Sequence, residues 1–237
     1  MKINREVFLK YLNSIFCDGL VEVVILEQNL SFTLEQPPGD SEIIMSGIYP
    51  GKVQGSQLSI GDLNLFRTII RKLQAKQEEI SLIKKENRIS ITAQEGKYLY
   101  LLADIDYADN RVKGKRKKIL LQGSTEKAPR LLLSNEQKQN IIKSIEILNP
   151  SEIMIETEQN KLLISIGTEQ EHQCKIEIKQ RKKMRKIEPL IYNPRHISGI
   201  LKNNDLIKLR ILKSGVLHII GDYVEYFLAS LVVDDEI

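Results

Sequence analysis

The chain has 237 residues, of which 42% are apolar and 28% are charged, with 35 lysines and arginines against 31 acids. Apolar residues recur along the whole length, which excludes a disordered protein, and no stretch reaches the roughly 18 apolar residues of a membrane span. The first residues lack the apolar core of a signal peptide, and Cys17 and Cys174 stand far apart in sequence. We therefore expect a reduced, cytoplasmic location.

The first half of the chain is predicted to contain two helices among several strands. Apolar residues at helical spacing predict a helix over residues 4–16, with Asn4 as its N-cap. A second helix is predicted over residues 63–76, capped by Asp62. Short or alternating apolar runs predict strands at residues 21–26, 30–34, 42–48, 80–84, 88–92 and 97–103.

The second half repeats this order. Ser134 is predicted to cap a third helix, and Pro194, directly after Asn193, is predicted to open a fourth. The predicted strands of this half lie at residues 152–156, 162–166, 175–179, 206–212, 216–220 and 224–231.

Matching residues of the two halves lie at a nearly constant offset, which indicates an internal duplication. Phe66 and Ile69 match Ile197 and Ile200 at an offset of 131, and Tyr100 is matched 126 residues later. We therefore predict an α+β protein of two similar domains, each with two helices packed on antiparallel sheet. The predicted domains span residues 1–110 and 131–237, and residues 111–130 form a connector that includes a possible edge strand.

Short stretches of sequence resemble the DNA polymerase sliding clamps, and the likeness covers essentially the whole chain. Residues 60–66, Ile-Gly-Asp-Leu-Asn-Leu-Phe, are similar to the segment that opens the second helix in the clamp of T-even bacteriophages. Residues 226–229, Tyr-Phe-Leu-Ala before an acidic tail, resemble the end of proliferating cell nuclear antigen. The architecture, the repeat and the length agree with the same family.

This resemblance implies a processivity factor, not an enzyme, in the form of a homotrimeric ring joined head to tail. Such a ring encircles double-stranded DNA without sequence specificity and tethers the replicative DNA polymerase. It is opened by an ATP-dependent clamp loader and needs no cofactor. The likeness to the T-even clamp further implies a bacteriophage protein that acts in viral DNA replication in the host cytoplasm. The alternative is a nucleic-acid-binding regulatory or scaffold protein that uses the same fold without forming a ring.

All four predicted helices carry cations outside their apolar stripes, as a ring that attracts phosphates without reading bases requires. The second helix is the most uniformly basic, since no acid interrupts its face between Asp62 and Glu78. Ordinary solvated helix faces are the alternative for each helix. The candidate DNA-binding residues are Arg5, Lys10, Arg67, Arg71, Lys72, Lys76, Lys138, Lys143, Arg195 and Lys202.

The resemblance also implies a pocket for partner peptides beside the last strand, formed by Phe227, Ala229 and Leu231. The alternative is that Phe227 and Leu231 are core residues of that strand. For the subunit interface, the alternation over residues 175–179 is typical of an exposed edge strand, which is predicted to pair with residues 117–121. The candidate interface residues are Lys117, Ile119, Leu121, Lys175, Ile176 and Ile178.

Two basic runs stand outside the predicted helices. Residues 111–118 hold six cations in eight positions, and residues 181–186 hold five in six. Both agree with solubilising loops, and both also agree with contact with DNA entering the ring or with protection of a sheet edge.

The sequence offers few enzyme motifs. Residues 81–84 fit the pattern Ser-x-x-Lys, but they lie on a predicted strand without the partner motifs, so chance explains the match better. His172, His196 and His218 are dispersed over a loop, a helix and a strand, and neither metal-ligand spacing nor a phosphate-binding glycine loop occurs. We therefore expect no catalysis and no metal site.

Overall fold

The structure is a computed structural model that describes residues 1–36, 43–73, 79–93, 96–111, 128–168, 170, 172–179 and 185–231. The helices are α1 (Arg5–Phe16), α2 (Leu63–Lys72), α3 (Ile105–Ala108), α5 (Asn135–Leu148) and α6 (Pro194–Lys202). The strands of the first half are β1 (Lys2–Asn4), β2 (Val24–Leu26), β3 (Phe32–Gln36), β4 (Ile43–Gly47), β5 (Leu58–Ile60), β6 (Glu79–Lys85), β7 (Arg88–Ala93) and β8 (Gly96–Leu101). Those of the second half are β9 (Leu131–Leu132), β10 (Ile153–Glu158), β11 (Lys161–Ile166), β12 (Cys174–Lys179), β13 (Ile187–Tyr192), β14 (Lys208–Ile211), β15 (Leu217–Ile220) and β16 (Val224–Leu228).

The longer described helices begin at the capping residues expected from the sequence. The side chains of Asn4, Asp62, Ser134 and Asn193 accept backbone N–H groups in the first turns of α1, α2, α5 and α6. Ser134 and Gln137 form a complete capping box. The four predicted helices are therefore confirmed, except that α2 ends at Lys72 and not at residue 76, because Leu73 is extended.

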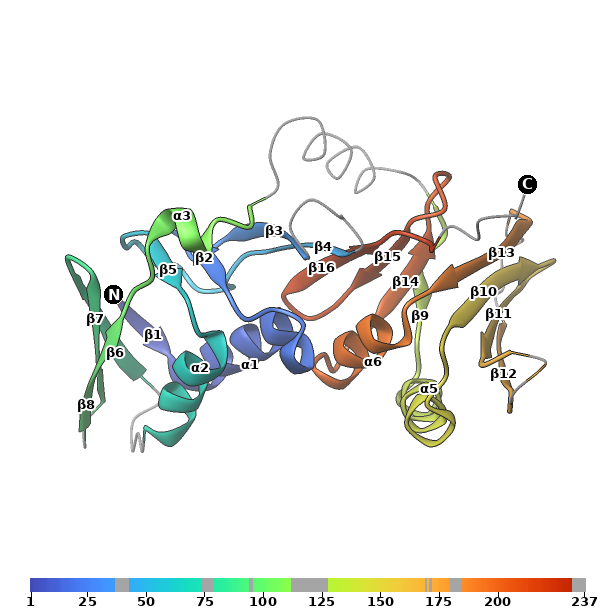
Figure 1. Cartoon of the computed structure of the whole chain (residues 1–237), viewed down its shortest axis with the longest axis horizontal. Helices are drawn as coiled ribbons and strands as arrows, with labels where there is room; N and C mark the ends of the chain where they lie inside the picture. The colour runs from blue at the N-terminus through green and yellow to red at the C-terminus, as the bar shows by residue number, and fades with distance from the viewer. Residues whose placement is uncertain are drawn as a thin grey trace.

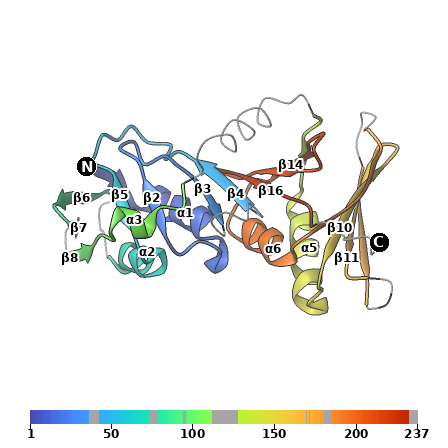
Figure 2. The ribbon, with the colours of Figure 1, turned by 45° about the horizontal axis from the view of Figure 1, so that its top comes forward.

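The described strands form three larger antiparallel sheets and one strand pair. The sheet β1-β6-β7-β8 lies at one end of the molecule, and the sheet β12-β11-β10-β13 lies at the other. Between them, the sheet β3-β4-β16-β15-β14-β9 combines two strands of the first half with four of the second, and β2 pairs with β5. Helices α1, α2, α5 and α6 lie along one side of these sheets (Figures 1 and 2).

The two halves share one order of elements, which explains the sequence repeat. The first half reads β1, α1, β2 to β5, α2, β6 to β8, and the second reads β9, α5, β10 to β13, α6, β14 to β16. Each strand of the first half thus has a counterpart: β4 corresponds to β12, β5 to β13 and β8 to β16. The predicted α+β duplication is confirmed.

A buried polar network joins the halves. The Tyr226 hydroxyl donates to the Ser14 carbonyl at 2.8 Å, and the Asn204 amide donates to the Tyr226 hydroxyl at 2.8 Å. The Ser14 hydroxyl in turn donates to the Asn204 side-chain oxygen at 3.2 Å. Burial raises the pKa of Tyr226 well above its usual range, so that its hydroxyl remains a donor. These bonds link α1 to α6 and β16, and so fix how the halves meet.

Several strands were not predicted from the sequence. Strands β1, β5 and β9 have only two or three residues each, and β13 contains Pro189. Short runs carry too little periodicity to be recognised, and proline argues against a strand unless it lies at a sheet edge. Strand β13 is indeed an edge strand of its sheet.

Candidate nucleic-acid and subunit interfaces

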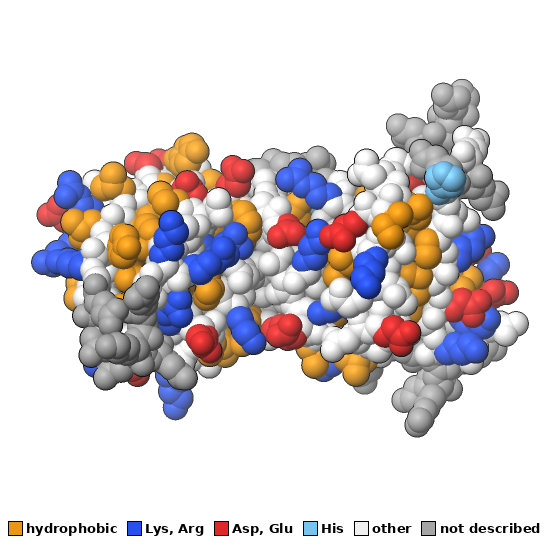
Figure 3. Space-filling view, turned by 90° about the horizontal axis from the view of Figure 1, so that it is seen from below, with side chains coloured by type: hydrophobic (Ala, Val, Ile, Leu, Met, Phe, Trp, Pro, Cys, Tyr) orange, Lys and Arg blue, Asp and Glu red, His pale blue; other side chains and the backbone are white. Residues whose placement is uncertain are grey.

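The helix side of the molecule carries many of the candidate DNA-binding cations. Seen from that side, lysine and arginine side chains extend along the face, and carboxylates lie among them (Figure 3). Arg71 and Lys72, in the last turn of α2, are exposed, as are Lys143 on α5 and Arg195 at the start of α6. Lys76 lies outside the described residues.

Arg5 and Arg67 lie on this side but are engaged with the protein. The Arg5 guanidinium donates to the carbonyls of Ile70 at 3.0 Å and Arg71 at 2.6 Å, and so satisfies acceptors at the C-terminal end of α2. The Arg67 guanidinium lies 3.9 Å from the centre of the Phe16 ring, and its Nη1 donates to Asn13 at 2.9 Å. Both arginines therefore hold α1 and α2 together.

The environment of Arg67 disfavours its charged form relative to a solvated arginine, although the guanidinium stays charged. Burial lowers the pKa of Arg67, and the neighbouring Arg71 charge acts in the same direction. Its Nε is buried without a hydrogen-bond partner among the described residues.

The prediction that Lys138 presents a cation for DNA is wrong. Its side chain is buried, and its Nζ donates to the Asn204 carbonyl at 2.9 Å. A buried ammonium needs such an acceptor, because burial without one would be costly. Lys138 therefore belongs to the network that joins the two halves.

Lys10 and Lys202 are paired with carboxylates. Lys10 Nζ lies 3.5 Å from Asp205, and Lys202 Nζ lies 3.0 Å from Glu146 and 3.6 Å from Asp18. The hydrogen bond from Lys202 to Glu146 raises the pKa of the lysine. These pairs span elements of both halves, and their carboxylates reduce the attraction of each lysine for phosphate.

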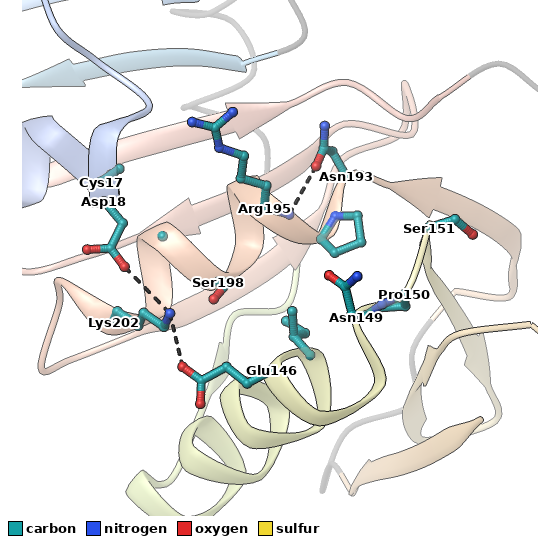
Figure 4. A pocket seen from close by; sticks show the side chains of 13 residues that line it. Cys17, Asp18, Glu146, Asn149, Pro150, Ser151, Asn193, Arg195, Ser198 and Lys202 are labelled. Carbon is teal, nitrogen blue, oxygen red and sulfur yellow. Dashed lines mark hydrogen bonds and ion pairs between the residues drawn. The ribbon is translucent and has the colours of Figure 1, made fainter. Parts of the chain in front are cut away.

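A groove of about 420 Å³ lies on the helix side. It is lined by α6, which contributes Arg195 and Lys202, and by residues at the C-terminal ends of α1 and α5. Lys202 reaches Asp18 and Glu146 at one end of the groove, whereas the Arg195 side chain extends away from that pair (Figure 4). The Asn193 side chain accepts the Arg195 backbone N–H at 3.0 Å, which anchors the start of α6. Arg195 thus projects from a fixed backbone.

Among the described strands, β12 and β8 are edge strands at opposite ends of the molecule. Strand β12, which contains the predicted Lys175, Ile176 and Ile178, is the edge of its sheet, as the sequence indicated. The predicted partner residues Lys117, Ile119 and Leu121 lie outside the described residues. At the opposite end the edge strand of the described sheet is β8.

Strand β8 was not predicted as a candidate interface, although it exposes large apolar side chains. Tyr98, Leu99 and Leu101 are 43%, 62% and 64% exposed. The counterparts of Tyr98 and Leu101 on β16, Val224 and Phe227, are buried, and β4 pairs with that strand. Because Tyr100 matches Tyr226 in the sequence repeat, β8 could have been identified from the sequence as the counterpart of β16.

Phe227, predicted to line a partner pocket, does not lie in the main core. It packs with Leu212, Ile44 and Val216 in a small separate cluster, the Phe227 cluster, and stacks on the His218 ring at a centroid distance of 4.2 Å. Ala229 is half-buried, and Leu231 is 37% exposed with its N–H bonded to the Ile191 carbonyl at 2.8 Å. Phe227 is nonetheless 6% exposed, so its side chain is buried in a cluster separate from the main core, and the partner pocket stays a prediction.

A charged network lies beneath the Phe227 cluster. Arg210 Nε donates to His218 Nδ1 at 2.8 Å, and His218 Nε2 lies 3.0 Å from the Glu225 carboxylate. With Nδ1 as acceptor, Nε2 carries the proton and donates to Glu225. This hydrogen bond lowers the pKa of Glu225, and the nearby arginines act in the same direction.

Within the described residues, no group of three or more histidine, cysteine or acidic side chains is placed to hold a metal ion. None of the described helices is long and apolar enough to cross a membrane. The basic runs lie mostly outside the described residues; of the second run, only Arg185 and Lys186 are described, and both are exposed.

The similar solved structures reported below are all described as sliding clamps or their subunits. The proliferating cellular nuclear antigen of Entamoeba histolytica matches with a TM-score of 0.73 at 14% identity, over 98% of each chain. The PCNA of A. fulgidus bound to the C-terminal region of FEN-1 matches with a TM-score of 0.73 at 12% identity, over 99% of this chain and 98% of that one. No family model and no curated protein matches the sequence.

A putative DNA polymerase III beta subunit from Eubacterium rectale is also similar, with a TM-score of 0.71 at 13% identity. The match covers 98% of this chain and 65% of that subunit, so the chain spans about two thirds of the bacterial protein. Together these likenesses show that the chain has the sliding-clamp fold.

Proposed function

We propose that copies of this chain join head to tail into a ring that encircles duplex DNA and tethers a DNA polymerase to it. The proposal rests on a correspondence between one strand pair inside the chain and two edge strands of the described sheets. Inside the chain, β16 pairs with β4. Their counterparts under the duplication are β8 and β12, which are both edge strands of the described sheets.

The register of the β16–β4 pair predicts the register in which β8 of one copy would pair with β12 of the next. Tyr226 lies opposite Met45 in the β16–β4 pair, and Glu225 lies opposite Ser46. The offsets of 126 and 131 residues convert these pairs into Tyr100 opposite Ile176 and Leu99 opposite Glu177. In the same register Tyr98 faces Ile178, so apolar side chains meet on the inner face, as a stable strand pair requires.

A head-to-tail contact of this kind is heterologous, and it forms a closed ring when the rotation between copies fits a whole number of subunits. We propose three copies, and so six similar domains, with the boundaries predicted above. The T-even bacteriophage relationship and the cytoplasmic location stay predictions. No catalysis, metal or cofactor of its own is assigned to the chain.

The exposed cations on the helices support the proposal that the ring encloses DNA. Arg71, Lys72, Lys143 and Arg195 would contact phosphates, which carry no sequence information and therefore permit sliding. Lys10 and Lys202 would contribute less, because their carboxylate partners must be displaced. Arg5 and Arg67 would act mainly by positioning α2.

The Phe227 cluster supports a binding site for partner peptides, of which a polymerase segment is the one we propose. The similar PCNA of A. fulgidus is described with the C-terminal region of FEN-1 bound. A polymerase bound outside a closed ring stays on the template, and an ATP-dependent loader would open that ring.

Cysteine cross-linking tests the ring. Leu99→Cys with Glu177→Cys, in a chain with Cys17→Ala and Cys174→Ser, places two exposed thiols opposite each other only between copies. Oxidation is expected to give a species of three 27.2-kDa chains, about 82 kDa, that is retained on nicked circular DNA and slides off linear DNA.

A pair shifted by two residues, Leu101→Cys with Glu177→Cys, is the matched control and should cross-link poorly. A purely monomeric protein at high concentration would favour the alternative, a scaffold that uses this fold without a ring. A cross-linked ring that is not retained on circular DNA would refute the DNA assignment alone.

A further inference from the structure

The sheet β1-β6-β7-β8 turns one face to the core and the other face to solvent. Ile80, Leu82, Ile89 and Ile91 are buried and belong to the core. Because side chains alternate along a strand, the residues between them point to the opposite side, which we call the outer face. The sheet lies at one end of the molecule (Figure 1).

Three large aliphatic side chains are exposed on the outer face. Ile83 of β6 is 48% exposed, and Leu99 and Leu101 of β8 are 62% and 64% exposed. The strand register places Ile83 and Leu99 on either side of Ser90, in one row across three strands. Exposed apolar side chains that gather in this way, with polar groups around them, mark interaction surfaces of soluble proteins.

Cations surround these aliphatic side chains. Lys85 and Arg88 lie in the row on one side of Ile83 and Leu99. Lys2 and Lys97 lie in the row on the other side. All four cations are exposed, and none of them forms an ion pair within the part of the chain that the structure describes.

Fewer carboxylates lie next to this face. Among the described residues of these strands and their turns, they are Glu79 at the start of β6 and Glu86 in the turn between β6 and β7. Four cations against two carboxylates give the outer face a positive potential, which attracts anionic groups to the aliphatic side chains.

The outer face of the sheet at the other end of the molecule is different. Its cations are matched in number by carboxylates, and Lys161 pairs with Glu177 at 2.9 Å. These charged residues are Lys161, Lys175, Lys179, Glu156, Glu158 and Glu177. Among the described residues of β10 to β13, no large apolar side chain is classed as exposed. Exposed aliphatic side chains with excess cations are therefore a property of the first sheet and not of the fold.

The composition of the outer face argues against two kinds of ligand. A two-fold contact between the outer faces of two copies would bring Lys85 and Arg88 of each copy against like charges. In a nucleic acid the bases stack on aromatic rings, but Tyr98 and Tyr100 alternate with the leucines of β8 and point to the opposite side. The face therefore fits a ligand that offers both aliphatic side chains and carboxylates.

The last residues of the chain have this composition but lie too far away in the same chain. Residues 232–237 are Val-Val-Asp-Asp-Glu-Ile, and they follow Leu231, which bonds to Ile191 of β13 at the other end of the molecule. The six-stranded central sheet, about 24 Å wide, lies between the two ends. Six residues reach about 20 Å at most, so a partner supplies the segment.

We infer that the outer face binds an acidic segment of a protein partner, whose aliphatic side chains pack on Ile83, Leu99 and Leu101 and whose carboxylates pair with the four surrounding cations. The site is a face of the sheet, whereas the proposed subunit contact uses the edge of β8. The inference goes beyond the proposed function and depends neither on ring closure, nor on DNA, nor on the Phe227 cluster.

Parallel selections from a random peptide library displayed on phage test this inference. One target is the full chain, and the other is the full chain with Ile83→Ser and Leu99→Ser. Peptides enriched only on the unmodified chain are expected to combine leucine, isoleucine or valine with aspartate or glutamate. Their affinity, measured by fluorescence anisotropy, should fall about tenfold or more in Lys85→Glu with Arg88→Glu, and should weaken with added salt.

The matched control, Arg185→Glu with Lys186→Glu, reverses two exposed charges in the second half of the chain and should bind these peptides as the unmodified chain does. Thermal melting of each variant identifies a loss that is due to unfolding, and Lys85→Gln with Arg88→Gln then repeats the test without reversed charge. Sedimentation velocity shows whether a variant also changes the oligomer, which separates a lost edge contact from a lost face.

Other results would overturn the inference. One is that no peptide is enriched only on the unmodified chain, or that such peptides lack acids. Another is that the variants of the outer face lose binding to a polythymidine oligonucleotide, or to vesicles of phosphatidylserine and phosphatidylcholine, and not to peptides. A third is peptide binding that appears only after removal of residues 232–237, which would make the end of a neighbouring copy the occupant.

Discussion

The last strands of the two halves occupy equivalent places in the fold but have opposite surroundings. On β16, Val224 and Phe227 are 1% and 6% exposed, because β4 pairs with that strand. On β8, the counterparts Tyr98 and Leu101 are 43% and 64% exposed. Apolar side chains on both strands thus have the same requirement, and within the described residues only β16 has a partner strand that meets it. The difference supports the proposal that a neighbouring copy covers β8.

The strongest test of this comparison places one charge at equivalent positions. Tyr98→Asp should raise the dissociation constant of the oligomer about 100-fold or more while the monomer stays folded, because the carboxylate would be buried against Ile178 of the next copy. Val224→Asp should destabilise the chain itself by about 3 kcal/mol or more, because its partner strand is internal. Sedimentation velocity and thermal melting separate the two outcomes. An intact oligomer in Tyr98→Asp would rule out the β8 interface.

The network that joins the halves should be the next most sensitive feature. Asn204→Ala removes the amide that donates to both Ile200 and Tyr226 and accepts the Asp222 N–H. We expect it to lower the free energy of unfolding by about 2–4 kcal/mol in denaturant titrations, since buried partners lose their bonds. Asn203→Ala, at a half-buried neighbour with a single side-chain bond to Gly199, should cost about 1 kcal/mol. Equal costs would mean that the network is not cooperative.

Helices α2 and α6 offer a finer comparison of cations. Arg71 corresponds to Lys202, but Arg71 is exposed whereas Lys202 is paired with Glu146. Arg71→Ala should therefore weaken DNA retention more than Lys202→Ala, and should reduce the slope of log affinity against log salt by about one. Arg67→Ala should instead lower the free energy of unfolding by about 1–2 kcal/mol through loss of the Phe16 and Asn13 contacts. A larger effect of Lys202→Ala on the salt slope would contradict this ranking.

The smallest expected effect is a pH dependence confined to the second half. Glu225 corresponds to Leu99 in the first half, so only the second half has a carboxylate at this place. The hydrogen bond from His218 lowers the pKa of Glu225 below 4.5, so its stabilisation is present above about pH 4.5 and is lost as pH falls through the lowered value. Glu225→Gln should remove that part of the acid-induced decrease in melting temperature. An unchanged acid profile in Glu225→Gln would show that the His218 bond does not contribute.

The fold was largely predictable because its signals are local. A cap lies within three residues of the turn it stabilises, as Ser134 and Gln137 show, and an apolar stripe repeats every three or four residues. The duplication doubled these signals, so the pattern around Phe66 was supported by the pattern around Ile197. The short strands β1, β5 and β9 lacked such support and were missed.

The candidate sites were only partly predictable because charge and burial depend on distant residues. Lys138 and Lys143 are alike in sequence, yet Lys138 is bonded to a carbonyl 66 residues away and Lys143 is exposed. The edge strand β12 was predicted from its alternation, whereas β8 was recognised only when its sheet was known.

By itself, the sequence determined the positions of the four longer helices, most of the strands and the duplication, since hydrogen bonding and side-chain periodicity act over a few residues. Only the tertiary structure decided which of two equivalent strands is covered among the described residues and which cations stay exposed. Those outcomes depend on which groups from remote parts of the chain come within bonding distance, and no local pattern records that.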